Sequence, residues 1–245
     1  MTLRRRLGLT YRGGATAYLF VLPSILFITV FVIIPIFGIL YYSFTDYDLL
    51  TPPKWVGLEN YQKAPDEPRF FPAIRNTLFF ALGTVPAGVV TSLLLAVLIN
   101  RAIRGIYFFR AMFYMPVVSS FVSVSLIFLW LYEPQVGFAN ETLRAVGLPG
   151  SKWLLGPETA LMAIIIMSIW KNMGLNMVLY LAGLQSIPPH LYEAADIDGA
   201  GRVSKMFRIT LPLLAPTTYF VVIVYFIGAL QVFVQMYIMT CRTTF

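Results

Sequence analysis

The chain has 245 residues, of which 58% are hydrophobic and 12% are charged, and its formal net charge is +7. An ordinary soluble domain carries about 25% charged residues, so this chain could scarcely cover a water-facing surface, and the composition indicates a membrane protein. The bases cluster in short segments between apolar runs, which disfavours nucleic-acid binding, and a single cysteine and a single histidine exclude an internal disulfide and a Cys/His metal cluster.

Five apolar segments are long enough to cross a membrane. A hydrocarbon layer of about 30 Å needs roughly 20 helical residues. Because lipid offers backbone groups no hydrogen-bond partner, each segment must be essentially helical, with its prolines absorbed as kinks. The expected fold class is an all-α integral membrane protein, a polytopic bundle of about five transmembrane helices. The segments lie near residues 16–45, 77–100, 112–133, 160–186 and 209–240.

The chain is expected to divide into two parts. Residues 1–72 hold the N-terminus, the first transmembrane helix and an outer loop, and residues 73–245 hold the core. In the second predicted helix, Thr84, Gly88 and Ser92 recur every four positions. Small residues at this spacing predict close packing of that helix against a neighbour.

Basic residues between the apolar segments predict the orientation. With a cytoplasmic N-terminus, the inner segments carry ten bases and the outer segments seven, and eight of the eleven acids fall outside. Cytoplasmic loops of membrane proteins carry an excess of Lys and Arg, so this orientation is favoured. It places the polar stretch near residues 187–210 in the cytoplasm.

This polar stretch is predicted to form a bent elbow. Pro188 and Pro189 stop the preceding helix, and Pro189 suits the first turn of a new one because its missing N–H would be unpaired there. Gly199 can take the left-handed conformation that ends a helix, and Asp198 could cap the next helix by accepting a backbone N–H. Pro212 is expected to start the last membrane segment.

Each arm of the elbow has an apolar side. The apolar or small positions of the first arm, spaced at i, i+4, i+7 and i+8, are Ile187, Leu191, Ala194 and Ala195. They form a narrow face whose alanines would let another protein's backbone approach closely. The second arm, residues 200–208, separates apolar from basic side chains. An amphipathic connector that merely touches lipid head groups is the alternative.

The spacing of residues in this stretch resembles a known motif. Glu193-Ala194-Ala195 is followed after three residues by Gly199, and after nine more by the sequence I-T-L-P that ends at Pro212. This pattern resembles the coupling loop of permease subunits in binding-protein-dependent ABC importers, a cytoplasmic elbow that docks on a nucleotide-binding subunit. A generic connector would not need the combination. The resemblance implies that the ATPase-docking residues are Glu193, Ala194, Ala195, Asp198, Gly199, Ala200, Phe207 and Pro212.

The resemblance covers most of the chain from about residue 16. Residues 57–61, Gly137 with Asn140, Trp153-Leu154 and residues 181–185 look like recurring words of carbohydrate-type permeases, which include maltose and glycerol-3-phosphate uptake systems. It implies a type I ABC importer permease fold in a bacterial or archaeal inner membrane. The implied partners, besides the lipid bilayer, are a second permease subunit, two ABC ATPase subunits and an extracytoplasmic solute-binding protein.

The resemblance also implies a transport subunit and not an enzyme. The sequence contains no G-x-x-x-x-G-K-[ST] phosphate loop, so ATP and Mg²⁺ would be bound by the partner ATPase, and the chain itself needs no cofactor or metal. Movement of the elbow would rock the helices in alternating access and translocate a sugar or sugar-like solute. Permeases of this type usually continue beyond Thr240 into one further helix, so we expect the last spanning helix to be missing.

Polar residues of the fourth segment are the candidates for the translocation path. Lys171 lies near its middle, where an ionisable group is costly and marks a solute path or a buried pair by default. Ser168, Asn172 and Asn176 recur every four residues as a polar stripe beside it. The stripe could bind sugar hydroxyls or hold helices together, and Lys171 could instead face a subunit interface or reach water. Lys171 weakly permits an anionic solute.

Two other classes of protein remain as alternatives. A secondary transporter or channel needs no ATPase and should show internal repeats or paired intramembrane charges, which this sequence lacks. An integral membrane enzyme requires acid, base or metal groups gathered near one membrane face. The only acid cluster, Glu193, Asp196 and Asp198, falls in the elbow pattern instead.

Overall fold

The computed structural model describes residues 14–100 and 105–240, with side chains from residue 18 onward. The arginines that precede the first span, together with Arg101, Arg104 and Arg242, contribute to the predicted orientation and lie outside these residues. Contacts divide the chain into two units, residues 1–71 and 72–245. The division falls one residue before the boundary expected from the sequence.

The first unit contains a helix that is long and apolar enough to span a membrane, Tyr18–Tyr42. Pro35 lacks the N–H that would bond one turn back, and membrane helices accommodate such a defect by a local π adjustment. The first predicted span is therefore confirmed as a helix. Its parts are α1 (Gly14–Ile28), a π-helical turn (Thr29–Ile33) and α2 (Ile34–Ser43).

A short connection follows α2. Its elements are β1 (Thr45–Asp46), β2 (Lys54–Trp55), α3 (Glu59–Lys63) and a 3₁₀ turn (Ala64–Asp66). The strands pair antiparallel, with Thr45 opposite Trp55. The Asn60 side chain donates to the main-chain oxygens of Ser43 and Thr45 at 3.0 and 2.9 Å, which ties α3 to the end of α2. Two strands of two residues each leave the predicted all-α class intact.

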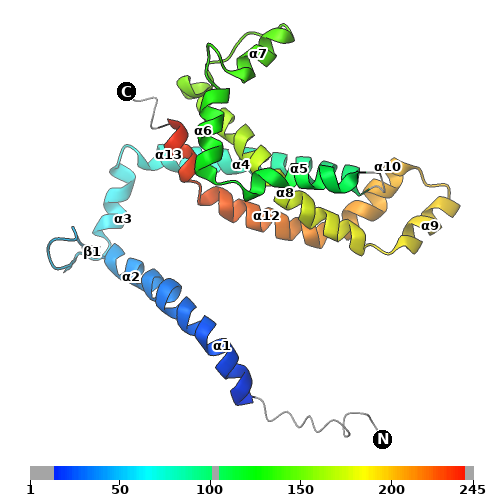
Figure 1. The fold of residues 1–245 in the computed structure, drawn as a ribbon. Coiled ribbons are helices and arrows are strands. Elements are labelled where there is room, and N and C mark those ends of the chain that lie inside the picture. The colour runs from blue at the N-terminus through cyan, green and yellow to red at the C-terminus, as the bar shows by residue number, and fades with distance from the viewer. Residues whose placement is uncertain (1–13, 101–104, 241–245) are drawn as a thin grey trace, which may run out of the picture. The chain divides into compact units, whose positions relative to one another are not determined.

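From α4 onward the described chain is helical apart from its connections (Figure 1). α4 and α8 have 30 residues each, about 45 Å at 1.5 Å per residue, and each is long enough to span a bilayer. α8 contacts α5, α6, α12 and α13. The helices are α4 (Phe70–Ile99), α5 (Ile106–Val118), α6 (Phe121–Leu131), α7 (Phe138–Ala145), α8 (Pro157–Ser186), α9 (Pro189–Ile197), α10 (Arg202–Lys205), α11 (Leu211–Leu213), α12 (Ala215–Leu230) and α13 (Val234–Thr240).

Glycines allow the closest approaches between these helices. A Cβ added at Gly174 of α8 would lie 2.1 Å from the Phe113 main-chain oxygen, so α5 crosses α8 where no side chain can fit. A Cβ added at Gly88 of α4 would lie 2.2 Å from the Tyr225 ring of α12. The predicted close-packing face of α4 is confirmed, because its three small residues, Thr84, Gly88 and Ser92, are all buried.

The third predicted span, residues 112–133, is broken, and the break does not lie at its proline. α5 and α6 meet at an angle of 100° across Ser119 and Ser120, whose backbones are both extended. The Ser120 hydroxyl accepts the N–H of Val122 at 3.2 Å and so caps α6. Serine side chains compete for backbone groups in this way and favour helix ends. Two adjacent serines therefore end one helix and begin the next within an apolar run.

The fifth predicted span, residues 209–240, is also broken. α12 begins at Ala215 after a bend of 64°, so Pro212 precedes this membrane helix instead of starting it. The proline in the first turn of α12 is Pro216, where the absent N–H would have no helical partner. A second break, at residues 231–233, separates α12 from α13.

One buried side chain holds the connection between α6 and α8. Asn140 donates to the main-chain oxygens of Pro134 and Ser151, at 2.8 and 2.9 Å. Its amide oxygen accepts the main-chain N–H of Ser151 and the indole N–H of Trp153. All four hydrogen-bonding positions of the amide are thus used. The Trp153 ring also stacks on Tyr132, with 4.7 Å between the ring centroids.

We expect Gly174→Ala to destabilise the protein by about 1–3 kcal/mol, the usual cost of overpacking, because the new methyl group would meet the Phe113 carbonyl. The measurement is thermal unfolding of the detergent-solubilised chain. Gly38→Ala in α2 is the matched control, since nothing lies within 4 Å of a Cβ at that position. Equal shifts for the two variants would contradict the close crossing of α5 and α8.

Candidate functional site

The elbow predicted between the fourth and fifth apolar segments is present. α8 ends, and after two residues α9 starts with Pro189 in its first turn. At the other end of α9, the Ala200 N–H bonds to the Ala195 oxygen at 2.8 Å. The Gly199 N–H bonds to the Asp196 oxygen at 3.1 Å, which completes the Schellman arrangement that closes a helix. Gly199 has φ +72°, the left-handed conformation that the sequence predicted.

Two details of the predicted elbow are wrong. Asp198 does not cap the second arm, because Gly201 occupies the N-cap of α10, with no side-chain hydrogen bond. The predicted apolar face of the first arm is turned partly inward. Ile187 is buried and Leu191 packs against the chain's own core, while Ala194 is exposed. The face begins directly after α8, so its first residues complete the core that surrounds the end of α8.

Other residues form the outward apolar surface of the elbow. Ile197 at the tip of α9 is 87% exposed, and Val203 and Phe207 of the second arm are 71% and 65% exposed. Large apolar side chains this exposed indicate contact with another protein or with a membrane. The sequence signal for Ile197 was a lone apolar residue between two aspartates. Of the predicted docking residues, Ala195 and Ala200 are half-buried and the exposed ones are Glu193, Ala194, Asp198, Gly199, Phe207 and Pro212.

Two side-chain contacts tie the arms of the elbow together. Near the tip, Lys205 of α10 forms an ion pair with Asp196 of α9, and the Lys205 side chain is only 18% exposed. Near the base, the hydroxyl oxygens of Tyr192 and Thr210 lie 2.9 Å apart, and Thr210 is buried. Because both contacts cross from one arm to the other, the elbow is one braced unit and not two independent helices.

The base of the elbow is part of the helical core. Leu191 and Tyr192 pack against a buried cluster to which Ile187 belongs. Tightly packed groups move together, so displacement of the elbow would shift the ends of α4, α8 and α12 as one body. The other members of the cluster are Ala96, Ile99, Met177, Tyr180, Leu184, Leu214 and Val221.

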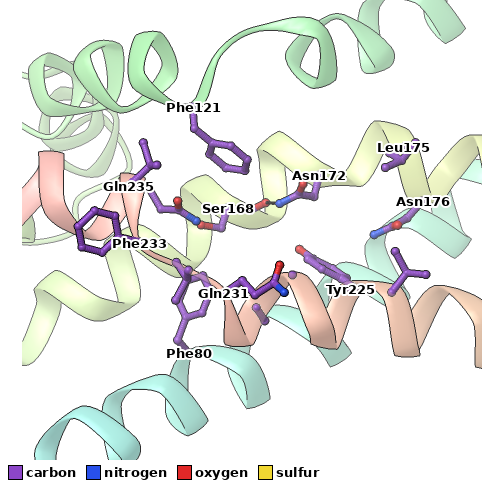
Figure 2. Close-up of a pocket in the computed structure, with 15 residues that line it drawn as sticks. Phe80, Phe121, Ser168, Asn172, Leu175, Asn176, Tyr225, Gln231, Phe233 and Gln235 are labelled. Carbon is purple, nitrogen blue, oxygen red and sulfur yellow. Dashed lines mark hydrogen bonds between the residues drawn. The ribbon is translucent and has the colours of Figure 1, made fainter. Parts of the chain in front are cut away.

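A cavity lies between α8 and α12, next to the ends of α6 and α13. Its volume is about 360 Å³, within the range of small-molecule sites. Figure 2 shows Phe121 extending from the start of α6 toward polar groups on α8 and α12. The polar side chains that line the cavity are Ser168, Asn172, Asn176, Tyr225, Gln231 and Gln235.

Two of these lining residues have a buried polar atom without a hydrogen-bond partner in the described part of the chain. They are Ser168, through its hydroxyl, and Asn176, through its amide nitrogen, and these residues are 1% and 4% exposed. Leaving a buried polar group unpaired costs about 1–3 kcal/mol, so such groups call for an explanation. Both atoms are covered in this arrangement of the helices, so a small movement of α8 or α12 would be needed to expose them to a molecule in the cavity.

The structure brings three of the four predicted path residues to this cavity. Ser168, Asn172 and Asn176 line it, and the Asn172 amide donates to the Ser168 main-chain oxygen at 2.9 Å. Lys171 is not among the lining residues. Its ammonium group donates to the Val117 main-chain oxygen at 3.0 Å, on the side of α8 that faces α5. Only 4% of Lys171 is exposed, so it does not reach water either.

Tyr225, Gln231 and Gln235 were not predicted as site residues. The available signal was their polarity within the fifth apolar segment. Their convergence depends on the break at residues 231–233, which the hydropathy pattern does not show. Irregular backbone in membrane segments is tolerated where protein covers it or where it lines a cavity, and transporters build solute sites at such breaks. The break between α5 and α6 and the break between α12 and α13 both border this cavity, since Phe121 and residues 231–235 line it.

One uninterrupted helix carries both the cavity and the elbow. α8 runs without a break from the polar stripe to Ser186, directly before the elbow. Asn176 and Ile187 are therefore separated by about 16 Å, at 1.5 Å per residue. A rigid helix of this length transmits displacement at one end to side chains at the other.

A family model and many known proteins are similar to this chain. The family model, described as "Binding-protein-dependent transport system inner membrane component", matches residues 85–243. The probable ABC transporter permease protein YurN of Bacillus subtilis (strain 168) is 36% identical over 228 residues, which cover 91% of this chain and 78% of the relative. The lactose transport system permease protein LacF of Rhizobium radiobacter is 37% identical over 224 residues, which cover 90% of this chain and 74% of the relative.

A solved structure is also similar to this chain. It is the crystal structure of a bacterial ABC transporter involved in the import of the acidic polysaccharide alginate. One of its chains matches with a TM-score of 0.75 and 30% sequence identity, covering 89% of this chain and 74% of that one. Similarity of fold and sequence therefore extends over both the cavity and the elbow.

Two glycines of the elbow form a matched pair for mutation. We expect Gly199→Ala to destabilise the C-terminal turn of α9 by about 1 kcal/mol, because Gly199, unlike Gly201, has positive φ. Hydrogen exchange of the amides near Ala200 should become about fivefold faster. Gly201→Ala should leave exchange unchanged, since Gly201 has φ −67° and, like Gly199, has open space around it. Equal effects at both positions would argue against the left-handed turn.

Proposed function

This chain belongs to the family of binding-protein-dependent transport system inner membrane components and is an ABC importer permease, and we propose that it forms part of the membrane pathway for a sugar or sugar-like solute. The family match favours this function over a secondary transporter or channel. As a permease it is a transport subunit, so the hydrolysis of ATP belongs to a partner.

The observation that carries the proposal is the uncharged polar cavity, joined through α8 to the braced elbow. No carboxylate, ammonium or guanidinium group lines the cavity among the described residues. Amide and hydroxyl groups are the donors and acceptors that pair with sugar hydroxyls. The lactose transport name of one relative agrees with this chemistry. With Lys171 bound to α5, no described residue of the cavity favours an anionic solute.

The proposed translocation path uses both predicted and unpredicted residues. Ser168, Asn172 and Asn176 form one wall on α8. Tyr225 and Gln235 contribute from α12 and α13, on the other side. Movement of the helices would expose the buried Ser168 hydroxyl and Asn176 amide to solute hydroxyls, and the aromatic wall would contact the apolar ring faces of the solute.

The proposed partners follow from the elbow and from the family. The exposed Ile197 and Phe207, with Glu193 nearby on α9, would dock on an ABC ATPase, and two such subunits would bind the ATP and Mg²⁺ that this chain does not need. A second permease subunit would complete the pathway. An extracytoplasmic solute-binding protein would deliver the solute, as the family description indicates. The chain would lie in the inner membrane with its N-terminus and elbow in the cytoplasm.

The proposed mechanism is alternating access driven through the elbow. Closure of the two ATPase subunits on ATP would displace the elbow, and the Asp196–Lys205 ion pair would keep its arms together. The packed base of the elbow would then move the ends of α4, α8 and α12. Movement of α8 would shift the polar stripe and open the cavity toward one side of the membrane at a time.

We expect Ile197→Asp to weaken binding of the ATPase subunit about tenfold or more, since a charge replaces an apolar side chain at the centre of the proposed contact. Co-purification of the ATPase in mild detergent measures the effect. Leu148→Asp is the matched control, because Leu148 is 53% exposed but lies in the connection before α8, away from the elbow. Undiminished co-purification of the Ile197→Asp variant would refute the docking role.

We expect Ser168→Ala to raise the KM of solute uptake about three- to tenfold, the worth of one hydrogen bond, with expression unchanged. Uptake of labelled sugars into membrane vesicles measures it. Ser125→Ala is the control, because Ser125 is also buried with an unpaired hydroxyl but does not line the cavity. If both serine variants transport like the parent protein, the cavity is not the solute path.

A further inference from the structure

Lys171 joins three helices by two contacts. Its ammonium group donates to the Val117 main-chain oxygen in the last turn of α5, at 3.0 Å. The same nitrogen lies 4.8 Å from the centroid of the Phe121 ring, the first residue of α6. Lys171 itself sits on α8, so a single side chain connects α8 to both sides of the bend between α5 and α6.

The carbonyl that Lys171 binds is one that helix geometry leaves free. The last four carbonyls of a helix have no N–H partner within it, and α5 ends at Val118 because Ser119 and Ser120 are extended. The Ser120 hydroxyl accepts the Val122 N–H of α6, and the Ser119 hydroxyl donates to the Met115 oxygen of α5, so neither of these bonds involves the Val117 oxygen. A cation is also favoured at this end of a helix by the helix dipole.

No carboxylate accompanies the buried ammonium group. Three ion pairs occur among residues 14–100 and 105–240, and none includes Lys171. Its partners are a carbonyl dipole and an aromatic face, which attract a cation without neutralising it. A buried ammonium group in an ion pair would be hard to separate from its carboxylate. The contacts made by Lys171 instead permit the bend to move away from α8 and to return.

Phe121 connects this arrangement to the solute cavity. Its ring lines the cavity together with Ser168 and Asn172 (Figure 2). The Lys171 ammonium group lies over the same ring. Gly174, one turn after Lys171, lets the α5 backbone approach α8 closely. The contact with Lys171 therefore fixes the position of the Phe121 ring, which forms the cavity wall opposite the polar stripe.

We propose that Lys171 is a positioning residue that pins the bend between α5 and α6 against α8 and thereby holds Phe121 in place as a wall of the cavity. It does not contact the solute. When the helices rock, release of this pin would move Phe121 and change the access to the cavity. The proposal rests on the proposed function only for its effect on transport, since the pin itself is a property of the chain.

The first test measures the bend directly. A reporter cysteine replaces Ser119, which is exposed at the break, in a chain whose native Cys241 is changed to Ser. With the assembled importer in membranes, Lys171→Met should accelerate or slow thiol labelling at position 119 about tenfold, since both contacts of the ammonium group are lost. Lys171→Arg retains a cation and should restore most of the parent rate. A reporter at Ser186, at the far end of α8, should not respond.

The second test measures the consequence for transport. Lys171→Met should raise the KM of sugar uptake more than it lowers the maximal rate, because the cavity wall is displaced while the elbow is intact. Phe121→Leu removes the ring but keeps the hydrogen bond from Lys171 to the Val117 oxygen. It should therefore shift the labelling rate and the KM in the same direction as Lys171→Met, but by a smaller amount. This variant also covers the case in which Lys171→Met does not fold.

The possible outcomes separate the pin from the proposed function. Unchanged labelling at position 119 in both variants would overturn the pin, even if Ser168→Ala impairs uptake as expected. The pin would also be overturned if Lys171→Met changed the labelling rate and Lys171→Arg did not restore it, because the cation would then be irrelevant. Altered labelling together with restoration by arginine supports the pin, whatever solute the importer carries.

Discussion

Backbone groups in an apolar environment must find partners inside the protein, and this constraint decides where the chain can bend. Several bends in the second unit are supported by a residue that satisfies or relaxes a helix end. Lys171 binds a free carbonyl of α5, and Arg110 donates to the Ile99 oxygen at the end of α4, at 3.4 Å. Gly199 closes α9 in the left-handed conformation. The bend held by Lys171 borders the cavity through Phe121, and the turn at Gly199 shapes the elbow.

α8 gains its central role from the different residues on its sides. Gly174 admits the backbone of α5, and Lys171 on the same side binds its end. Ser168 and Asn176 face the cavity with unpaired polar groups. The end of the helix leads into the elbow through Ile187, which is buried in the core. Under the proposed function, docking and solute passage would be linked by one rigid element, and no separate relay would be required.

The charged and the neutral polar groups of α8 have different surroundings. Its buried lysine bonds to the end of α5, while the cavity beside it is lined by neutral groups. A charge inside a membrane protein is often a sign of an ion or proton pathway. Here its partners are backbone and an aromatic ring, and the proposed solute path follows the polar but uncharged stripe instead. Neutral amides and hydroxyls agree with the sugar names among the relatives.

The sequence by itself determined the helical membrane class, the family and the elbow. Segment length, proline positions and the spacing from Glu193 to Pro212 depend on residues close together in the chain, so they can be read without a structure. Tertiary structure alone decided that Lys171 meets Val117, 54 residues away, and leaves the cavity to its neighbours. It also decided that Tyr225 and Gln235 share that cavity. Such convergence depends on helix crossings and breaks, which apolar patterns do not encode because lipid and a protein neighbour select the same side chains.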